Sequence, residues 1–147
     1  MGSLTVAVCA LTGLIASTAL AITPGVHAFN ADLQDGPCRH AYCGSGELTG
    51  FGRVKTSVVL RLFAGRPKRC FTVVGTRRLT LANDRKSTLR LALKGKWCGR
   101  LIRGTFKVTS GSGLFAGATG SGVVTGSTTK TGREHVHFSG TLTLARK

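Results

Sequence analysis

The sequence predicts an all-β protein, with one domain of short antiparallel strands arranged as a sandwich or, as we favour, a closed barrel. From residue 47 onward apolar and polar side chains alternate with a period of two. About seven to nine such strands follow one another at intervals of about 8–12 residues, and no later stretch keeps a helical period. The length of 147 residues fits one domain. Closure into a barrel is favoured because it removes exposed sheet edges.

The first element is an uncharged apolar segment at residues 4–22, which is typical of the core of a signal peptide. We assign residues 1–28 to the signal peptide. Cleavage after Ala21 and cleavage after Ala28 both fit small-residue sites, and the breaker at residues 23–25 favours Ala28. The alternative is a retained membrane anchor, because the segment is long enough to span a bilayer. The sequence therefore predicts a secreted, extracellular protein.

Cysteine usage agrees with export, since four cysteines remain after the signal segment. An even number in a small exported chain predicts two disulfides, and three pairings are possible. The simplest joins Cys38 to Cys43 and Cys70 to Cys98. A zinc site is not favoured, because the chain has no C-x-x-C pair and the spacings are irregular. We expect no metal and no cofactor.

The next segment, residues 29–46, has no period and several turn-forming residues, so we expect an irregular arm held by the first disulfide. Residues 47–147 are then the barrel domain. Its clearest strand is at residues 53–63, where Val54, Thr56, Val58, Leu60 and Leu62 share one face. Further strands are expected at 69–74, 77–82, 87–93, 104–110, 123–129 and 135–144, with turns at 65–67, 75–76 and 83–84.

A glycine-rich run at residues 110–120 is the most specific motif. It does not match a dinucleotide-binding fingerprint, because Ala116 stands where a glycine is needed and no helix follows. We expect glycine turns, a close backbone approach and one large plug, Phe115. The motif residues are Gly111, Gly113, Phe115, Gly117, Ala118 and Gly120.

This run resembles the GGTGRFxGAxG signature of the allene oxide cyclase and dirigent barrels, and it is similar to runs in secreted bacterial relatives of unknown function. The flanking strands at 104–108, 123–126 and 139–144 resemble those of the family. The resemblance implies a calycin-like, antiparallel eight-stranded barrel with a central cavity, and it allows a homo-oligomer. Ser112 and Leu114 depart from the usual Thr and Arg. The acids do not stand in contexts that match the family's catalytic acids, so the fold transfers better than the activity. They are Asp32, Asp35, Glu47, Asp84 and Glu134.

The chain is strongly basic, with a formal charge of +16, and 16 of its 21 Lys and Arg lie at residues 53–107. Basic residues at turns could form a positive rim at one end of the barrel, which would attract an anionic polymer or a membrane surface. The alternative is an ordinary solvated surface. Few aromatic residues are interleaved, so specific nucleic-acid recognition is not favoured. The candidates are Arg66, Lys68, Arg69, Arg77, Arg78, Arg85, Lys86, Lys94 and Lys96.

Candidate cavity residues are polar side chains on predicted strands, although the sequence does not decide which face is inward. They are Arg61, Arg90, His135 and His137. The histidine pair could share a metal with His40 or Glu47, but exposed strand histidines are the favoured interpretation. No hydrolase triad occurs.

Two functions are compatible with these features of the sequence. We favour a non-catalytic binding protein that takes a small apolar ligand in the barrel or an anionic polymer or cell surface on its rim. The alternative is an isomerase or stereochemical guide similar to allene oxide cyclase or dirigent proteins. Polar groups converging in an open cavity would support the second function. A cavity filled by Leu, Val and Phe would support binding at the surface.

Overall fold

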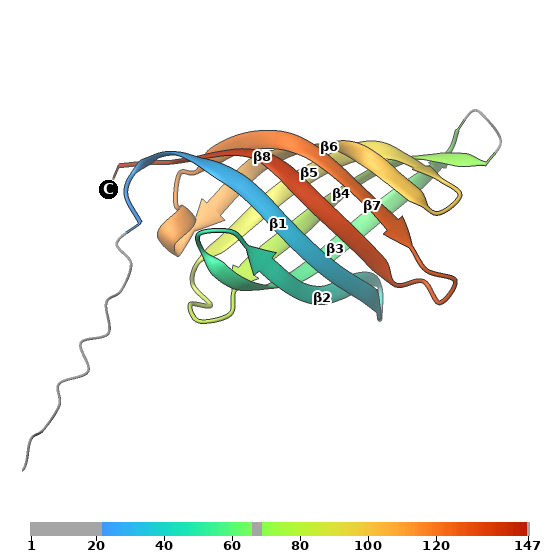
Figure 1. The fold of residues 1–147 in the computed structure, drawn as a ribbon, viewed down its shortest axis with the longest axis horizontal. Helices are drawn as coiled ribbons and strands as arrows, with labels where there is room; N and C mark the ends of the chain where they lie inside the picture. The colour runs from blue at the N-terminus through green and yellow to red at the C-terminus, as the bar shows by residue number, and fades with distance from the viewer. Residues whose placement is uncertain (1–21, 66–68, 147) are drawn as a thin grey trace, which may run out of the picture.

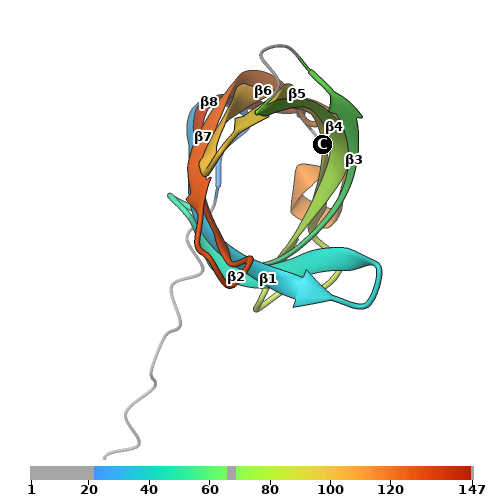
Figure 2. The ribbon, with the colours of Figure 1, turned by 90° about the vertical axis from the view of Figure 1, so that its right-hand side faces the viewer.

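The computed structural model describes residues 22–65 and 69–146. Eight antiparallel strands form one closed barrel in which each strand pairs with its neighbours in sequence, and β8 pairs with β1 (Figures 1 and 2). The predicted antiparallel eight-stranded barrel is confirmed. The elements are β1 (Gly25–Cys38), β2 (Ala41–Leu48), β3 (Gly52–Ala64), β4 (Cys70–Leu81), β5 (Thr88–Cys98), β6 (Leu101–Ser112), the 3₁₀ turn η1 (Gly113–Phe115), β7 (Thr119–Thr128) and β8 (Glu134–Leu144).

The two ends of the barrel differ. At the capped end lie the loops at 49–51 and 82–87, η1, and the starts of β1 and the end of β8. At the open end lie the turns at 39–40, 99–100 and 129–133, together with the end of β3 and the start of β4. The β3–β4 and β5–β6 hairpins extend to the right in Figure 1, and Figure 2 looks into the barrel from this open end.

The hydrophobic core fills the barrel toward the capped end. The rings of Phe29 and Phe106 lie 4.9 Å apart between centroids, and those of Phe106 and Phe138 lie 5.5 Å apart. Phe115 from η1 is buried and packs against Phe51. Leucines from β1, β2, β4, β5 and β8 complete this core, so the capped half of the barrel is a packed interior and not a channel.

Residues 29–46 are not the irregular arm that we predicted; they form most of β1 and β2. The period was hidden because β2 consists mainly of small residues and because a glycine and a proline precede the last residue of β1. On β1 the residues Phe29, Ala31, Leu33 and Asp35 alternate inward as a strand requires. The barrel domain therefore begins at Gly25 and not at residue 47.

Gly75 and Thr76 are also not a turn, because both lie inside β4, which joins the two strands predicted at 69–74 and 77–82. Gly75 pairs with Leu60 of β3, and a Cβ there would meet the carbonyl oxygen of Val59. The glycine thus marks a close approach of two strands. The turn expected at 83–84 is present, and residues 66–67 of the turn expected at 65–67 lie outside the described residues.

Both disulfides predicted as the simplest pairing are formed, Cys38–Cys43 and Cys70–Cys98. They support an oxidising compartment. The predicted signal segment and the anchor alternative fall largely on residues 1–21, outside the described part of the chain. Within that described part, no helix is long and apolar enough to cross a membrane.

Candidate functional site

A cluster of four polar side chains lies inside the barrel, between the packed core and the open end. Asp35 of β1, Thr56 of β3, Arg77 of β4 and Glu134 of β8 are each no more than 5% exposed. Arg77 Nη1 donates hydrogen bonds to Asp35 Oδ2 at 2.6 Å and to Thr56 Oγ1 at 2.7 Å. The guanidinium carbon also lies 5.3 Å from the centroid of the Phe138 ring. Arg77 is therefore the centre of the cluster.

Strand periodicity places these groups inside. Asp35 follows the inward Leu33, Arg77 precedes the inward Leu79, and Glu134 precedes the inward Val136. Closure of the barrel then brings Asp35 and Glu134 together, because they are cross-strand partners in the β1–β8 ladder. The cluster thus depends on residues that are far apart in sequence.

The electrostatics of the cluster centre on Glu134. Burial raises the pKa of its carboxyl group above the ordinary value of 4.5; the charge of Arg77 opposes this shift and the charge of Asp35 adds to it. Arg77 and Asp35 form an ion pair that balances their charges. A neutral Glu134 would leave the whole cluster uncharged.

Three buried atoms of the cluster have no hydrogen-bond partner among the described residues: Asp35 Oδ1, Arg77 Nε and Glu134 Oε1. Buried polar atoms are normally paired, and an unpaired one costs about 1–3 kcal/mol. One N–H donor and two carboxyl oxygens of the cluster therefore remain available to hydrogen-bond a bound molecule inside the barrel.

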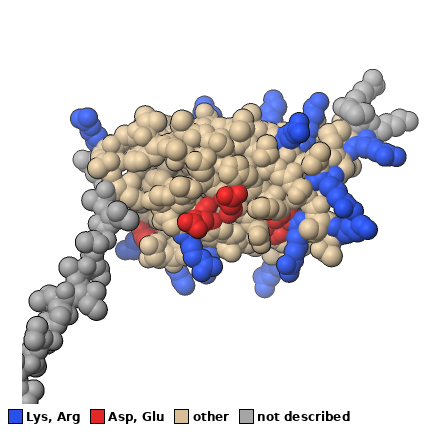
Figure 3. All heavy atoms as spheres, in the orientation of Figure 1, with Lys and Arg blue, Asp and Glu red and all other residues tan. Residues whose placement is uncertain are grey.

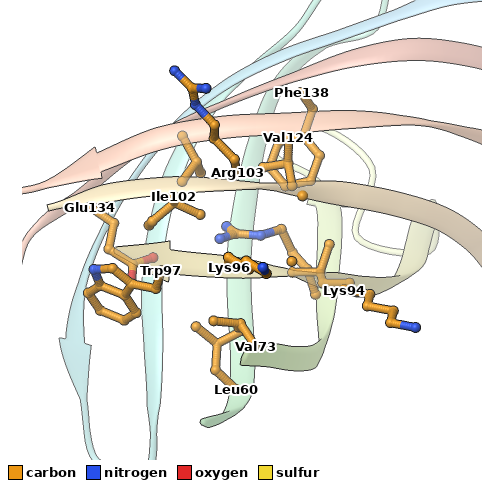
Figure 4. Close-up of a pocket in the computed structure, with 15 residues that line it drawn as sticks. Leu60, Val73, Lys94, Lys96, Trp97, Ile102, Arg103, Val124, Glu134 and Phe138 are labelled. Carbon is orange, nitrogen blue, oxygen red and sulfur yellow. The ribbon is translucent and has the colours of Figure 1, made fainter. Parts of the chain in front are cut away.

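An apolar pocket lies beside this cluster on the side of the open end. Its lining combines Arg77 and Glu134 with apolar side chains from β3 to β8, and Lys94, Lys96 and Arg103 also border it. Its cavity volume is about 40 Å³. Figure 4 shows Trp97, Ile102 and Glu134 close together on one side, whereas Lys94 and Arg103 point away. The apolar lining residues include Leu60, Val73, Leu93, Trp97, Ile102, Val124, Val136 and Phe138.

The wall of the pocket contains the glycine pair Gly95 and Gly104, which are partners in the β5–β6 ladder. A Cβ on Gly95 would meet the carbonyl oxygen of Arg103. These positions therefore add no side chain to the pocket. Toward the hairpin tips a second hollow is lined by Leu62, Arg69, Phe71, Trp97 and Gly99. Trp97 lines both hollows, so an apolar surface runs from the polar cluster to the tips of the β3–β4 and β5–β6 hairpins.

None of the four predicted cavity residues lines the apolar pocket, although His135 borders an open hollow that Asp35 and Glu134 also line. Arg61, Arg90, His135 and His137 are all exposed, because the inward positions of their strands are taken by their neighbours in the alternation. His137 Nδ1 lies 2.8 Å from Asp32 Oδ1 on the outer surface. His40 and Glu47 are also exposed. Among the described residues, no group of three His, Cys, Asp or Glu could hold a metal ion.

The basic candidates do not form one rim. Arg77 is buried in the cluster, which corrects its assignment to the surface. Arg69 directly precedes β4, and Lys94 and Lys96 lie on β5 toward the open end. Arg85 and Lys86 are instead exposed in the loop at the capped end. Figure 3 shows Lys and Arg side chains most densely at the right-hand, open end. Arg78 is exposed on the barrel wall, and Arg66 and Lys68 lie outside the described residues.

The glycine-rich run caps the barrel. Gly113 and Gly117 have positive φ values of 58° and 69°, and Phe115 between them is buried as the expected plug. Ser87 Oγ accepts a hydrogen bond of 2.7 Å from the backbone N–H of Leu114 and donates one to Asp84. Gly111, Ala118 and Gly120 flank this turn. The motif is at the end opposite the pocket, so it acts on the fold and does not touch the candidate site.

The sequence did not single out Asp35, Thr56 and Glu134 as site residues. It also suggested Arg77 for the basic outer surface, whereas Arg77 lies in the interior of the barrel. The available signal was a charged residue in phase with inward apolar ones, as in Glu134, Val136 and Phe138. Comparisons of the chain with family models, with curated proteins and with solved structures found no match.

Proposed function

We propose that the protein is a secreted barrel that binds a small, mostly apolar molecule through its open end without altering it. The observation that carries this proposal is the set of three unpaired polar atoms beside an apolar pocket. Small-molecule sites typically combine apolar walls with a few convergent polar groups. The apolar part of the ligand would contact Trp97 and Ile102, and its polar group would reach Glu134 and Arg77.

The charge balance of the cluster selects the polar group. Arg77 and Asp35 neutralise each other, and burial favours the protonated form of Glu134. With Glu134 protonated, a charged ligand group placed against the cluster would find no unpaired counter-ion in it and would lose its hydration. We therefore infer a neutral hydroxyl, carbonyl or amide group on the ligand. Such a group can accept a hydrogen bond from the N–H of Arg77 Nε, and it can form a second hydrogen bond with the carboxyl group of Glu134.

Secretion is supported by the two disulfides and by the signal-like segment at residues 4–22. The compartment suits a carrier or scavenger of poorly soluble molecules.

The test uses the fluorescence of Trp97, the only tryptophan of the chain. Decanol, decanoate and decylamine share an alkyl chain and differ in head-group charge. We expect saturable quenching or a spectral shift with decanol at lower concentration than with the two ions. Ile102→Arg should abolish the response, whereas the exposed Thr125→Arg should retain it. Circular dichroism of both variants checks the fold. Equal responses to all three probes, or none, would contradict the proposal.

One observation supports the alternative, an isomerase or guide similar to allene oxide cyclase or dirigent proteins. A buried carboxyl with a raised pKa beside an arginine is suited to donate a proton to a bound oxygen atom. Under this alternative Glu134 is the acid and Arg77 orients the ligand. The test substrates are unsaturated epoxides with a long alkyl chain. The parent protein should rearrange them, whereas the Glu134→Gln variant should bind them without rearranging them. Recovery of unchanged epoxide would exclude this activity for that substrate class.

A further inference from the structure

Exposed apolar side chains gather at the tips of two hairpins at the open end. Among the described residues, seven large hydrophobic side chains are exposed, and four of them lie near these tips. Leu62 and Phe63 are on β3, Phe71 is on β4 and Leu101 is on β6, and each is between 45% and 57% exposed. Apolar side chains concentrated in this way mark an interaction surface more often than scattered ones do.

Cations surround these apolar tips. Arg61, Arg69, Lys96, Arg100 and Arg103 are exposed on the same two hairpins. The exposed acids of the described chain, Asp32, Glu47 and Asp84, lie on β1, on β2 and in the loop at the capped end. The right-hand end of the molecule in Figure 3 shows this excess of blue side chains. The tips therefore combine apolar and positive character without an exposed acid.

We propose that the β3–β4 and β5–β6 hairpins dock the open end of the barrel on a membrane surface that contains anionic lipids. Phe and Leu side chains enter the boundary between head groups and acyl chains, while Lys and Arg attract the anionic head groups. The Cys70–Cys98 disulfide joins the two hairpins near their tips and holds their apolar residues in one arrangement.

A lipid surface explains the tips better than a soluble polyanion does. A polymer such as a nucleic acid would use the cations, and aromatic rings could stack on its bases. Leu62 and Leu101 stack on no base, yet they are as exposed as the two phenylalanines. Burial of aliphatic side chains together with charge neutralisation is characteristic of interfacial membrane binding.

Docking would also place the pocket against the bilayer, because the apolar surface that leads to it begins at these hairpins. A poorly soluble ligand could then pass between lipid and barrel without crossing water. This consequence rests on the proposed ligand binding, whereas docking itself does not.

Co-sedimentation of the full chain with vesicles tests the proposal. Phosphatidylcholine vesicles are compared with vesicles that also contain phosphatidylglycerol. We expect binding mainly to the second kind. Phe63→Ser/Leu101→Ser should weaken it at least about tenfold, and Lys96→Gln/Arg103→Gln should weaken it by a similar or larger factor. The matched control Val123→Ser/Lys107→Gln removes an exposed apolar and a basic residue from the barrel wall and should bind as the parent does.

All variants share the apolar N-terminal segment, so differences between them report on the hairpins alone. Equal binding of the two tip variants and the control would overturn the proposal. Loss of binding with the charge variant but not with Phe63→Ser/Leu101→Ser, together with retention on heparin or DNA, would assign the surface to a soluble polyanion instead. The Trp97 titration in vesicle-free solution is a separate readout, so ligand binding can survive if docking fails.

Discussion

At the scale of single residues, Glu134 links the interior of the barrel to pH. Its folded pKa is raised, so its stabilising contribution is fully present below the unfolded pKa and is lost as pH rises through the folded pKa. Glu134→Gln keeps a neutral side chain of the same shape at every pH. We expect the variant to match the parent near pH 4 and to exceed its free energy of unfolding at neutral pH, because the parent loses this contribution as pH rises.

Urea unfolding across a pH series measures this difference. Glu47→Gln is the control, because it removes a carboxyl group from the exposed outer face of β2 instead of from the interior. A Glu134→Gln variant that loses stability at neutral pH would mean that the carboxylate, and not the acid, is the form that the barrel holds.

Gly113 is a second residue with a testable role, because a single added Cβ atom there should lower the stability of the fold. Its φ of 58° disfavours any side chain, and a Cβ would lie 2.5 Å from Ser87 Oγ, the acceptor for the N–H of Leu114. We expect Gly113→Ala to lower the free energy of unfolding by about 2–4 kcal/mol, since backbone strain and a displaced hydrogen bond add.

Gly99 provides the matched comparison, because its φ is 60° but a Cβ there meets nothing within 4 Å. Gly99→Ala should lower the free energy of unfolding by about 1–2 kcal/mol, because only backbone strain acts at this position. If thermal unfolding gave equal losses for the two variants, the contact with Ser87 would contribute nothing.

At the scale of elements, a strand could be predicted from the sequence where its inward positions carry large apolar side chains, and not where they carry glycine. Strand β3 could be predicted because Val54, Thr56 and Val58 alternate with polar residues, and all three are buried. Strand β2 could not, since its inward positions include Gly44 and Gly46, which carry no hydrophobic signal. The division of β4 at Gly75 failed for the related reason that a glycine in a close-packed barrel serves strand approach as often as a turn.

The two disulfides should differ in their effect on these elements. Cys70–Cys98 closes a loop with a sequence separation of 28, whereas Cys38–Cys43 has a separation of 5. On the chain-entropy argument, Cys70→Ser/Cys98→Ser should lower the free energy of unfolding by about 3–4 kcal/mol and Cys38→Ser/Cys43→Ser by about 2 kcal/mol. Denaturant unfolding of both double variants tests the order, and the reverse order would show that native contacts of the first hairpin outweigh loop closure.

At the scale of the whole molecule, the candidate site is a product of closure. Arg77 and Asp35 are 42 residues apart, and Glu134 reaches them only because β8 returns to β1. The sequence could predict a barrel from local alternation, but inward and outward faces depend on the register around the entire sheet. For this reason Arg61 and His135 were plausible cavity residues until the register was known, and both are exposed.

Closure also bears on where a signal peptidase would cut the chain if it is exported as we propose. The β1–β8 seam starts at Gly25, which pairs with Leu144, and continues through Ala28, which pairs with Thr141; Ile22 packs against the core just before it. Cleavage after Ala28 would delete the first four residues of this seam, whereas cleavage after Ala21 would preserve it. On the proposal that the protein is secreted, we therefore expect N-terminal sequencing of the mature chain to give Ile22. A chain beginning at Phe29 should melt several degrees lower than one beginning at Ile22, because shortening the only non-hairpin seam weakens the pairing that closes the barrel and brings Glu134 to Asp35. Equal melting temperatures, with Phe29 as the mature terminus, would show that residues 22–28 are dispensable for closure.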